Sequence, residues 1–116
     1  MQLYNTLSAK ERESLLEQAG EDRLTLSFYQ YAHIGNPELF RNHLFIAWDE
    51  LQVLGRIYVA HEGINAQLSV PAKNFAAFKS FLDGIYFLEN VRLNIAIEHD
   101  LKSFLKLKVK VRNKIV

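Results

Sequence analysis

The sequence contains no cysteine among its 116 residues. This absence excludes disulfides, zinc–thiolate sites, iron–sulfur clusters and a thiol nucleophile within these residues. Any thiol chemistry associated with the protein must therefore come from another segment. Long apolar runs are also missing, because no stretch approaches the roughly 20 residues that cross a bilayer, and residues 1–4 are not a basic flank followed by an apolar stretch. We therefore expect no membrane segment and a cytoplasmic location.

Proline and glycine are scarce, with two and five residues respectively. No linker, internal repeat or low-complexity run divides the chain. A typical domain has about 100–150 residues, and a chain of this length can bury a core without covalent staples. We predict a single domain over residues 1–116.

Acidic residues are missing from one end of the chain. The whole sequence has a net charge of +1, yet residues 101–116 contain six basic residues and no acidic one. Such an asymmetry is typical of a segment that meets an anionic partner.

The periodicity of the apolar residues predicts alternating strands and helices. Strands are expected at residues 24–31, 56–60, 66–70, 93–97 and 105–112, and helices at residues 7–19, 36–52 and 72–83. Asn36 and Pro37 provide the N-cap and first residue of the second helix, and Gly20, Gly55 and Gly84 are expected to end the three helices.

After the first helix, the order of predicted elements is β-α-β-β-α-β. This order predicts an α+β, ferredoxin-like (acylphosphatase-like) split βαβ fold, in which an antiparallel sheet carries helices on one face. The first helix and the basic strand at the C-terminal end are additions to that fold. The last strand is expected either to extend an edge of the sheet or to pair outside this chain.

The aromatic residues fall into two groups. Those at helical spacing are expected to pack in the core: Phe40, Trp48, Phe75, Phe78 and Phe81. Those on predicted strands could stack RNA bases on the open face of the sheet: Phe28, Tyr29, Tyr31 and Tyr58. Since alternate residues must face the helices, we expect about two of these four to be exposed, and the RNA-recognition signature Lys/Arg-Gly-Phe-Gly-Phe is missing.

The predicted connection at residues 61–65 is the densest cluster of functional side chains. His61 could act as an acid or base with Glu62 beside it, but neighbours in a strand point to opposite faces, and such pairs are often merely solvated. Gly63 and Asn65 can take the positive φ that a tight connection needs. No metal site is predicted, because the four histidines lack metal-ligand spacing: His33, His43, His61 and His99.

Four cations alternate with apolar residues near the C-terminal end. Strand geometry places them on one face at intervals of about 6–7 Å, close to the scale of phosphate spacing along a nucleic acid: Lys106, Lys108, Lys110 and Arg112. Arg56 is a further candidate contact. The row has two interpretations, contact with RNA or another polyanion, or protection of a sheet edge against aggregation.

A phosphate-cleaving enzyme of the acylphosphatase type is a third possibility. Such enzymes hold phosphate in a glycine-rich loop after the first strand, with an Arg in the loop and an Asn on a central strand. The corresponding residues 31–36 contain one Gly and no Arg, although Asn65 or Asn94 could replace the Asn. Without the cation, the charge of the transition state is unopposed.

Four segments of the chain resemble a known family. They are residues 28–31, 55–71, 92–96 and 108–116, and the most specific run is Ala-His-Glu-Gly-Ile-Asn-Ala-Gln at residues 60–67. They resemble the N-terminal portion of the rhodanese-domain tRNA hydroxylases, over nearly the whole chain. That family is understood to use dioxygen to convert the wobble uridine of certain tRNAs to 5-hydroxyuridine.

The resemblance implies that the rhodanese domain, whose loop carries the essential cysteine, belongs to the same polypeptide and is absent from this sequence. It implies an accessory domain with no catalytic residue and no cofactor of its own. Such a domain holds the anticodon region of tRNA, or forms one wall of the active site with His61, Glu62 and Asn65.

Two alternatives to RNA contact remain. In the first, the domain only docks the rhodanese domain, through the apolar face of the last strand: Leu105, Leu107, Val109 and Val111. In the second, more distant, it is a small acylphosphatase-like hydrolase.

Overall fold

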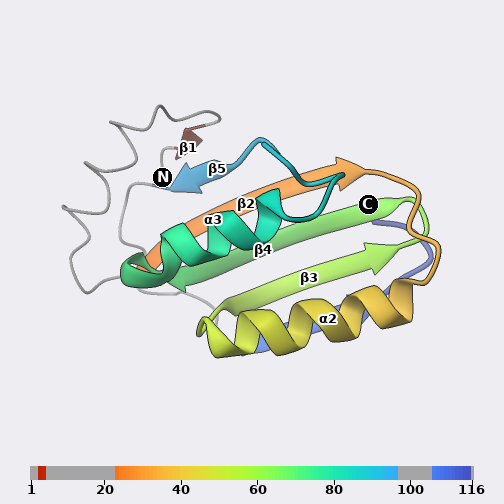
Figure 1. The fold of residues 1–116 in the computed structure, drawn as a ribbon, viewed down its shortest axis with the longest axis horizontal. Helices are drawn as coiled ribbons and strands as arrows, with labels where there is room; N and C mark the ends of the chain where they lie inside the picture. The colour runs from red at the N-terminus through yellow and green to blue at the C-terminus, as the bar shows by residue number, and fades with distance from the viewer. Residues whose placement is uncertain (1–2, 5–22, 97–105, 116) are drawn as a thin grey trace.

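The computed structural model of the chain describes residues 3–4, 23–96 and 106–115. The helix predicted at residues 7–19, together with Ile97, His99 and Leu105, lies outside the described residues. Within these ranges the chain forms a six-stranded sheet in the order β1-β5-β2-β4-β3-β6, with α2 and α3 on one face (Figure 1). The strands are β1 (Leu3–Tyr4), β2 (Arg23–Tyr31), β3 (Leu54–Ala60), β4 (Gly63–Pro71), β5 (Asn94–Ala96) and β6 (Leu107–Val111). The helices are α2 (Pro37–Glu50), the short 3₁₀ helix η1 (Ala72–Asn74) and α3 (Phe75–Asp83).

The predicted ferredoxin-like core is confirmed. Strands β5, β2, β4 and β3 are neighbours in that order and pair antiparallel, and the helices follow β2 and β4. The added basic strand β6 extends the sheet at one edge, where it pairs parallel with β3, so the sheet as a whole is mixed. The reason is the direction of β5, which runs opposite to β3 and therefore finishes at the end of the sheet where β3 begins. A strand that starts from this end runs in the same direction as β3.

The helix-covered face of the sheet is filled by alternate residues of its strands. On β2, Leu24, Leu26 and Phe28 are buried while their neighbours are not. Trp48 of α2 packs in the centre of this core, with its ring centroid 6.5 Å from that of Phe28. All five aromatic residues predicted to pack are buried or packed against the core, as expected: Phe40, Trp48, Phe75, Phe78 and Phe81.

The start of α2 is as predicted, but its end is not. The side chain of Asn36 accepts a hydrogen bond from the N–H of Leu39 at 3.1 Å, and Pro37 opens the helix. The helix ends at Glu50, before the positive φ of 61° at Gln52, so Gly55 does not terminate it. Gly55 lies inside β3 instead, where a Cβ atom would lie 2.3 Å from the carbonyl oxygen of Gln67. A glycine is needed there because β3 and β4 approach closely.

The β3–β4 connection is shorter than predicted. β3 continues to Ala60 and β4 begins at Gly63, so only His61 and Glu62 lie between the strands. Gly63 has the expected positive φ, 149°, whereas Asn65 is an ordinary strand residue that pairs with Tyr29 on one side and Tyr58 on the other. β4 therefore begins at Gly63, closer to the turn than the apolar residues of the predicted strand at residues 66–70 indicated.

Candidate nucleic-acid interface on the open face of the sheet

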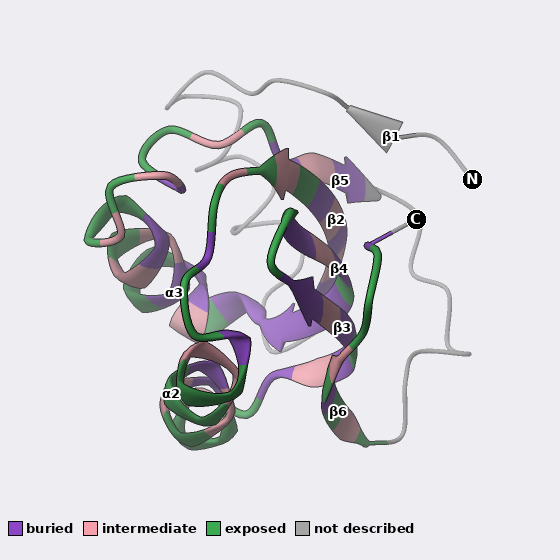
Figure 2. Ribbon diagram, turned by 90° about the vertical axis from the view of Figure 1, so that its right-hand side faces the viewer, coloured by how far each residue is buried: buried purple, intermediate pink, exposed green. Residues whose placement is uncertain are grey.

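The face of the sheet opposite the helices carries the predicted site residues. Figure 2 shows α2 and α3 on one side of the sheet and the C-terminal segment on the other. The described strands of this sheet contain no Asp or Glu. Their residues on this face are mostly polar, aromatic or basic.

The basic residues gather at the β3–β6 edge. We call the exposed set Arg56, Lys106, Lys108, Lys110 and Arg112 the cationic row. Lys108 pairs with Arg56 in the parallel register, so their side chains lie on the same face about 4.8 Å apart at the backbone. Backbone hydrogen bonds fix this register at both ends, from Gly55 to Lys106 and from Arg112 to Val59, each 2.8 Å long.

Arg112 is held by an aromatic ring. Its Cζ atom lies 5.1 Å from the ring centroid of Tyr58, within the range of a cation–π contact. The residue remains exposed, so the guanidinium group is oriented without losing its access to an anion. Arg112 is therefore the most fixed member of the cationic row.

The apolar face of β6 is occupied by the domain itself. Val109 is only 3% exposed and belongs to the core, and Leu107 packs against that core. The Nε of Arg41 on α2 donates to the carbonyl oxygen of Val109 at 2.7 Å. The expectation that Leu107 and Val109 dock another domain is therefore wrong, because their partner is this domain's own core.

The three predicted wall residues make hydrogen bonds within the chain. The Nδ1 of His61 lies 3.0 Å from the carbonyl oxygen of Ile34, whereas Oε1 of Glu62 accepts from the N–H of Ile115 at 2.9 Å. Asn65 donates through Nδ2 to the carbonyl oxygen of Ile115, also at 2.9 Å. His61 and Glu62 therefore bond to different segments, and the structure does not pair them as acid and base.

Glu62, Asn65 and Ile115 form a unit that we call the C-terminal clasp. Two side chains of the β3–β4 hairpin hold both backbone polar groups of Ile115, which is 2% exposed although it does not belong to the main core. The clasp brings the end of the chain across the open face, beside the central strands. The sequence indicated Glu62 and Asn65 as residues of an active-site wall, and gave no signal that Ile115 would be their partner.

Arg23 is a cation of this face that the sequence did not single out. Its Nε donates to Oγ of Ser69 at 3.0 Å, and its Nη2 donates to the carbonyl oxygens of Ser69 and Gln52. Burial lowers the pKa of Arg23 below its ordinary value. With its Nε and Nη2 donors used by the chain, Arg23 serves the fold and is not counted in the cationic row.

Two amide groups of the loop between β2 and α2 are used within the chain and are not free to bind a phosphate. The amide groups of Ala32 and Ile34 donate to the carbonyl oxygens of Glu62 and His61, and the side chain of Asn36 caps α2. Within the described residues, no group of three or more His, Asp or Glu side chains gathers to hold a metal. No helix in those residues has the length and apolarity to cross a bilayer.

The sheet order, the helices on one face and the added strands together define an acylphosphatase-like α+β domain. Residues 23–115 match the family described as the UPF0176 acylphosphatase like domain, and the chain belongs to this family. The family resemblance inferred from the sequence is thereby confirmed.

The chain is also similar to bacterial proteins named tRNA uridine(34) hydroxylase. It is 48% identical over 115 residues to the protein of Pectobacterium carotovorum subsp. carotovorum, covering 98% of this chain and 32% of that relative. It is 46% and 48% identical to the proteins of Photorhabdus laumondii and Cronobacter sakazakii, again over 98% of this chain. It covers 33% of the length of each of these two relatives. The chain thus spans about a third of the length of these curated relatives.

Proposed function

We propose that this chain is the tRNA-contacting accessory domain of a cytoplasmic tRNA uridine hydroxylase that forms 5-hydroxyuridine at the wobble position. The names of its relatives support the reaction, and the lack of cysteine in these residues is consistent with a reactive sulfur supplied by a rhodanese domain of the same polypeptide. In this proposal the cationic row contacts the phosphates of the anticodon region. His61, Glu62 and Asn65 then form part of one wall of the active site and have a supporting role, not a catalytic one.

The observation that carries the proposal is the pairing of Arg56 with Lys108 on a face without carboxylates in its strands. Two strands contribute cations to one surface, so the charge forms a patch and not merely a line along the edge. Protection against aggregation needs charge only on the outermost strand, whereas Arg56 lies one strand further in. A patch of this kind fits a polyanion.

The proposal is tested by measuring tRNA affinity as a function of salt concentration, for example by fluorescence anisotropy. Each phosphate contact that is lost reduces the slope of log K against log salt by about 0.7–0.9. We expect the double variant Lys108→Ala/Lys110→Ala to bind tRNA more weakly at low salt and to reduce this slope by about 1.5, and Arg56→Ala to reduce it further.

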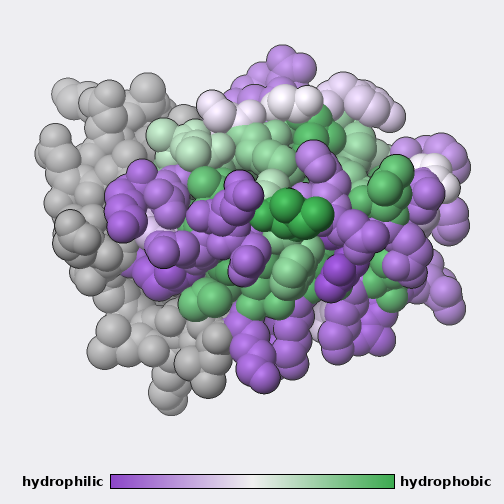
Figure 3. Space-filling view, turned by 60° about the horizontal axis from the view of Figure 1, so that its bottom comes forward, coloured by the Kyte–Doolittle hydropathy of each residue, from purple (hydrophilic) through white to green (hydrophobic). Residues whose placement is uncertain are grey.

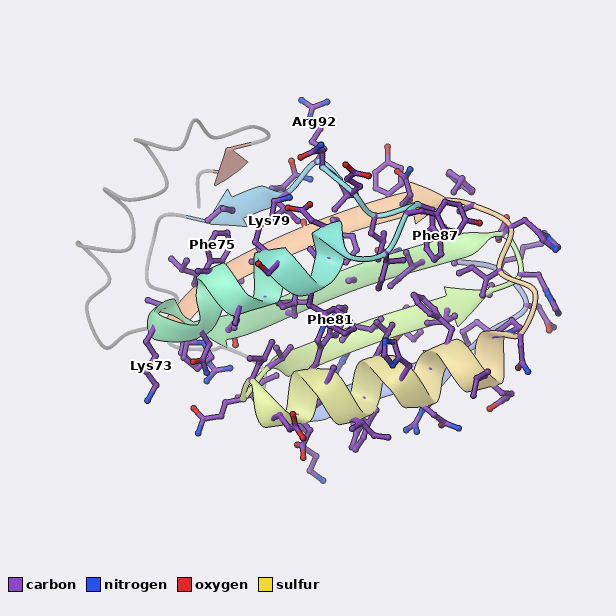
Figure 4. The ribbon with its side chains drawn as sticks, viewed as in Figure 1. Lys73, Phe75, Lys79, Phe81, Phe87 and Arg92 are labelled. Carbon is purple, nitrogen blue, oxygen red and sulfur yellow. The ribbon has the colours of Figure 1, made fainter. Side chains whose placement is uncertain are left out.

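The matched control removes two exposed cations from other parts of the molecule, Lys73 and Arg92 (Figure 4). The double variant Lys73→Ala/Arg92→Ala has the same net charge as the test variant and should retain the wild-type slope. Equal effects of the two double variants would mean that only net charge matters, and the cationic row would not be the contact.

A docking role is the second candidate. Leu39 and Ile46 are exposed and lie seven residues apart on α2, which places them on one face of the helix. Figure 3 shows hydrophobic side chains among hydrophilic ones on the side of the molecule where α2 lies. If the domain serves only to dock the rhodanese domain, Leu39→Ser/Ile46→Ser should weaken that association, while loss of the cationic row should leave tRNA binding by the whole enzyme unchanged.

A further inference from the structure

Two tyrosines on the open face are exposed and lie outside the hydrophobic core. Tyr29 and Tyr31 of β2 are 63% and 57% exposed. Phe28, which precedes Tyr29 and points to the opposite face of the sheet, is 1% exposed. Within the described residues, neither hydroxyl group has a hydrogen-bond partner. Their rings are 6.2 Å apart between centroids and inclined at 79°, so they form one edge-to-face pair.

The tyrosine pair and the cationic row lie on opposite sides of the same face. Tyr29 is in register with Asn65, Asn65 with Tyr58, and Tyr58 with Lys110. Three strand spacings separate Tyr29 from Lys110, which is roughly 14 Å. An extended strand of a few nucleotides covers such a distance, so one RNA segment can reach both groups.

Between them Asn65 is bonded to Ile115 in the C-terminal clasp, so the open polar surface lies one step further along the strands. Ser27, Gln67 and Arg56 are in register across β2, β4 and β3, one step along the strands from the row that contains Tyr29. The amide of Gln67 is exposed and can both donate to and accept from a base edge. The face therefore changes from aromatic rings on β2 through an amide on β4 to cations on β3 and β6.

This arrangement favours unpaired RNA over a duplex. Exposed rings bind bases by stacking, which requires a base whose flat surface is free, and double-helical RNA hides those surfaces within its stack. A nucleic-acid strand carries bases and phosphates together, which matches aromatic rings and cations on one face. The charge of the face is complementary to such a strand.

We propose that Tyr29 and Tyr31 form a base-stacking site that selects unpaired nucleotides while the cationic row holds their phosphates. This inference rests on the proposed function and adds the part of the RNA that is recognised. It separates two contributions: the cations determine how the affinity depends on salt, and the tyrosines determine the preference for single-stranded over paired RNA.

The experiment compares two RNA probes of equal length, an unstructured oligoribonucleotide and a blunt-ended, fully paired duplex, in binding to the 116-residue chain. We expect Tyr29→Ala/Tyr31→Ala to lower the affinity for the unstructured probe about tenfold or more and to leave the duplex affinity within about twofold. The salt slope should not change. Tyr29→Phe/Tyr31→Phe should restore most of the affinity, because phenylalanine keeps the stacking surface.

Tyr86→Ala is the matched control, since this tyrosine is 82% exposed but lies in the segment after α3. It should bind both probes as the wild type does. Circular dichroism melting of each variant checks that the fold is intact.

Three results would overturn the inference. The first is an unchanged affinity of the double alanine variant for the unstructured probe, as expected if a protein covers the tyrosines. The second is an equal loss for both probes. The third is a wild-type chain that binds neither probe, which would also remove the proposed function. If only the lysine variants lose affinity, the proposed function stands and the stacking site alone fails.

Discussion

On β2, Leu26 faces the helices and is almost completely buried, while Tyr29, three residues later on the same strand, points to the other face and is mostly exposed. The helix face is packed with aromatic and aliphatic side chains from the strands and the helices, and contacts among these side chains hold them in place. The open face has few such contacts, and its residues differ in charge and polarity from strand to strand. One set of strands thus supplies stability on one side and a surface available for binding on the other, so substitutions on the two faces should have separable effects.

The largest effect is expected in the centre of the helix face. Trp48→Ala should lower the free energy of unfolding by about 3–5 kcal/mol, because Trp48 is fully buried and packs against Phe28, Phe78 and Phe81. Urea unfolding followed by circular dichroism measures the change. Trp48→Phe should be much milder, since the buried indole N–H has no partner among the described residues. A loss below about 1 kcal/mol for the alanine variant would contradict the packing described here.

An intermediate effect on stability is expected at the C-terminal clasp, which holds Ile115 against the open face. Glu62→Ala and Asn65→Ala should each cost about 1 kcal/mol, as is typical for the loss of one hydrogen bond. Because both side chains bond to Ile115, the double variant should cost less than the sum of the single ones. Hydrogen exchange at the amide of Ile115 should become faster in Glu62→Ala, while Glu62→Gln, which keeps an acceptor oxygen, should retain most of the protection.

The comparison fails at this site if the exchange of Ile115 is the same in Glu62→Ala as in the wild type. Glu89→Ala, at an exposed position after α3, is the control for the loss of a carboxylate. It should change neither the exchange nor the stability.

The smallest effect on stability is expected from the cationic row. Lys108→Ala/Lys110→Ala should change the free energy of unfolding by less than about 0.5 kcal/mol, since both side chains are exposed and make no hydrogen bond or ion pair within the described residues. The same variant is expected to have the largest effect on tRNA binding. A stability loss comparable to that of Trp48→Ala would show that the two faces are not separable.

The sequence predicted the helix face better than the open face, for a physical reason. Alternation on β2 and helical spacing around Trp48 record the burial of apolar groups directly, so the core, the strands and the order of elements could be inferred from the residues. Gly55 was misjudged because a glycine that ends a helix and a glycine that lets two strands approach look the same in a sequence.

The direction of β6 and the partners of the hairpin could not be inferred in this way. Both depend on which distant segments meet: Glu62 bonds to a residue 53 positions away, and Asn65 bonds to the same residue 50 positions away. Side-chain chemistry indicated that these polar groups would be used, but not whether by a ligand or by the chain's own backbone. The alternation of Lys108 and Lys110 with Val109, by contrast, was sufficient to place the cations on one face.

The C-terminal clasp has a mechanical consequence. Tension applied to the end of the chain would first load two hydrogen bonds at Ile115, and only after they break would it reach the ladder between β6 and β3. Since both bonds end on the β3–β4 hairpin, the load is delivered to an interior part of the sheet, where strands are supported on both sides. The edge strand that carries Lys108 and Lys110 is thus shielded from pulling forces, and its cations keep their spacing while the end of the chain is displaced.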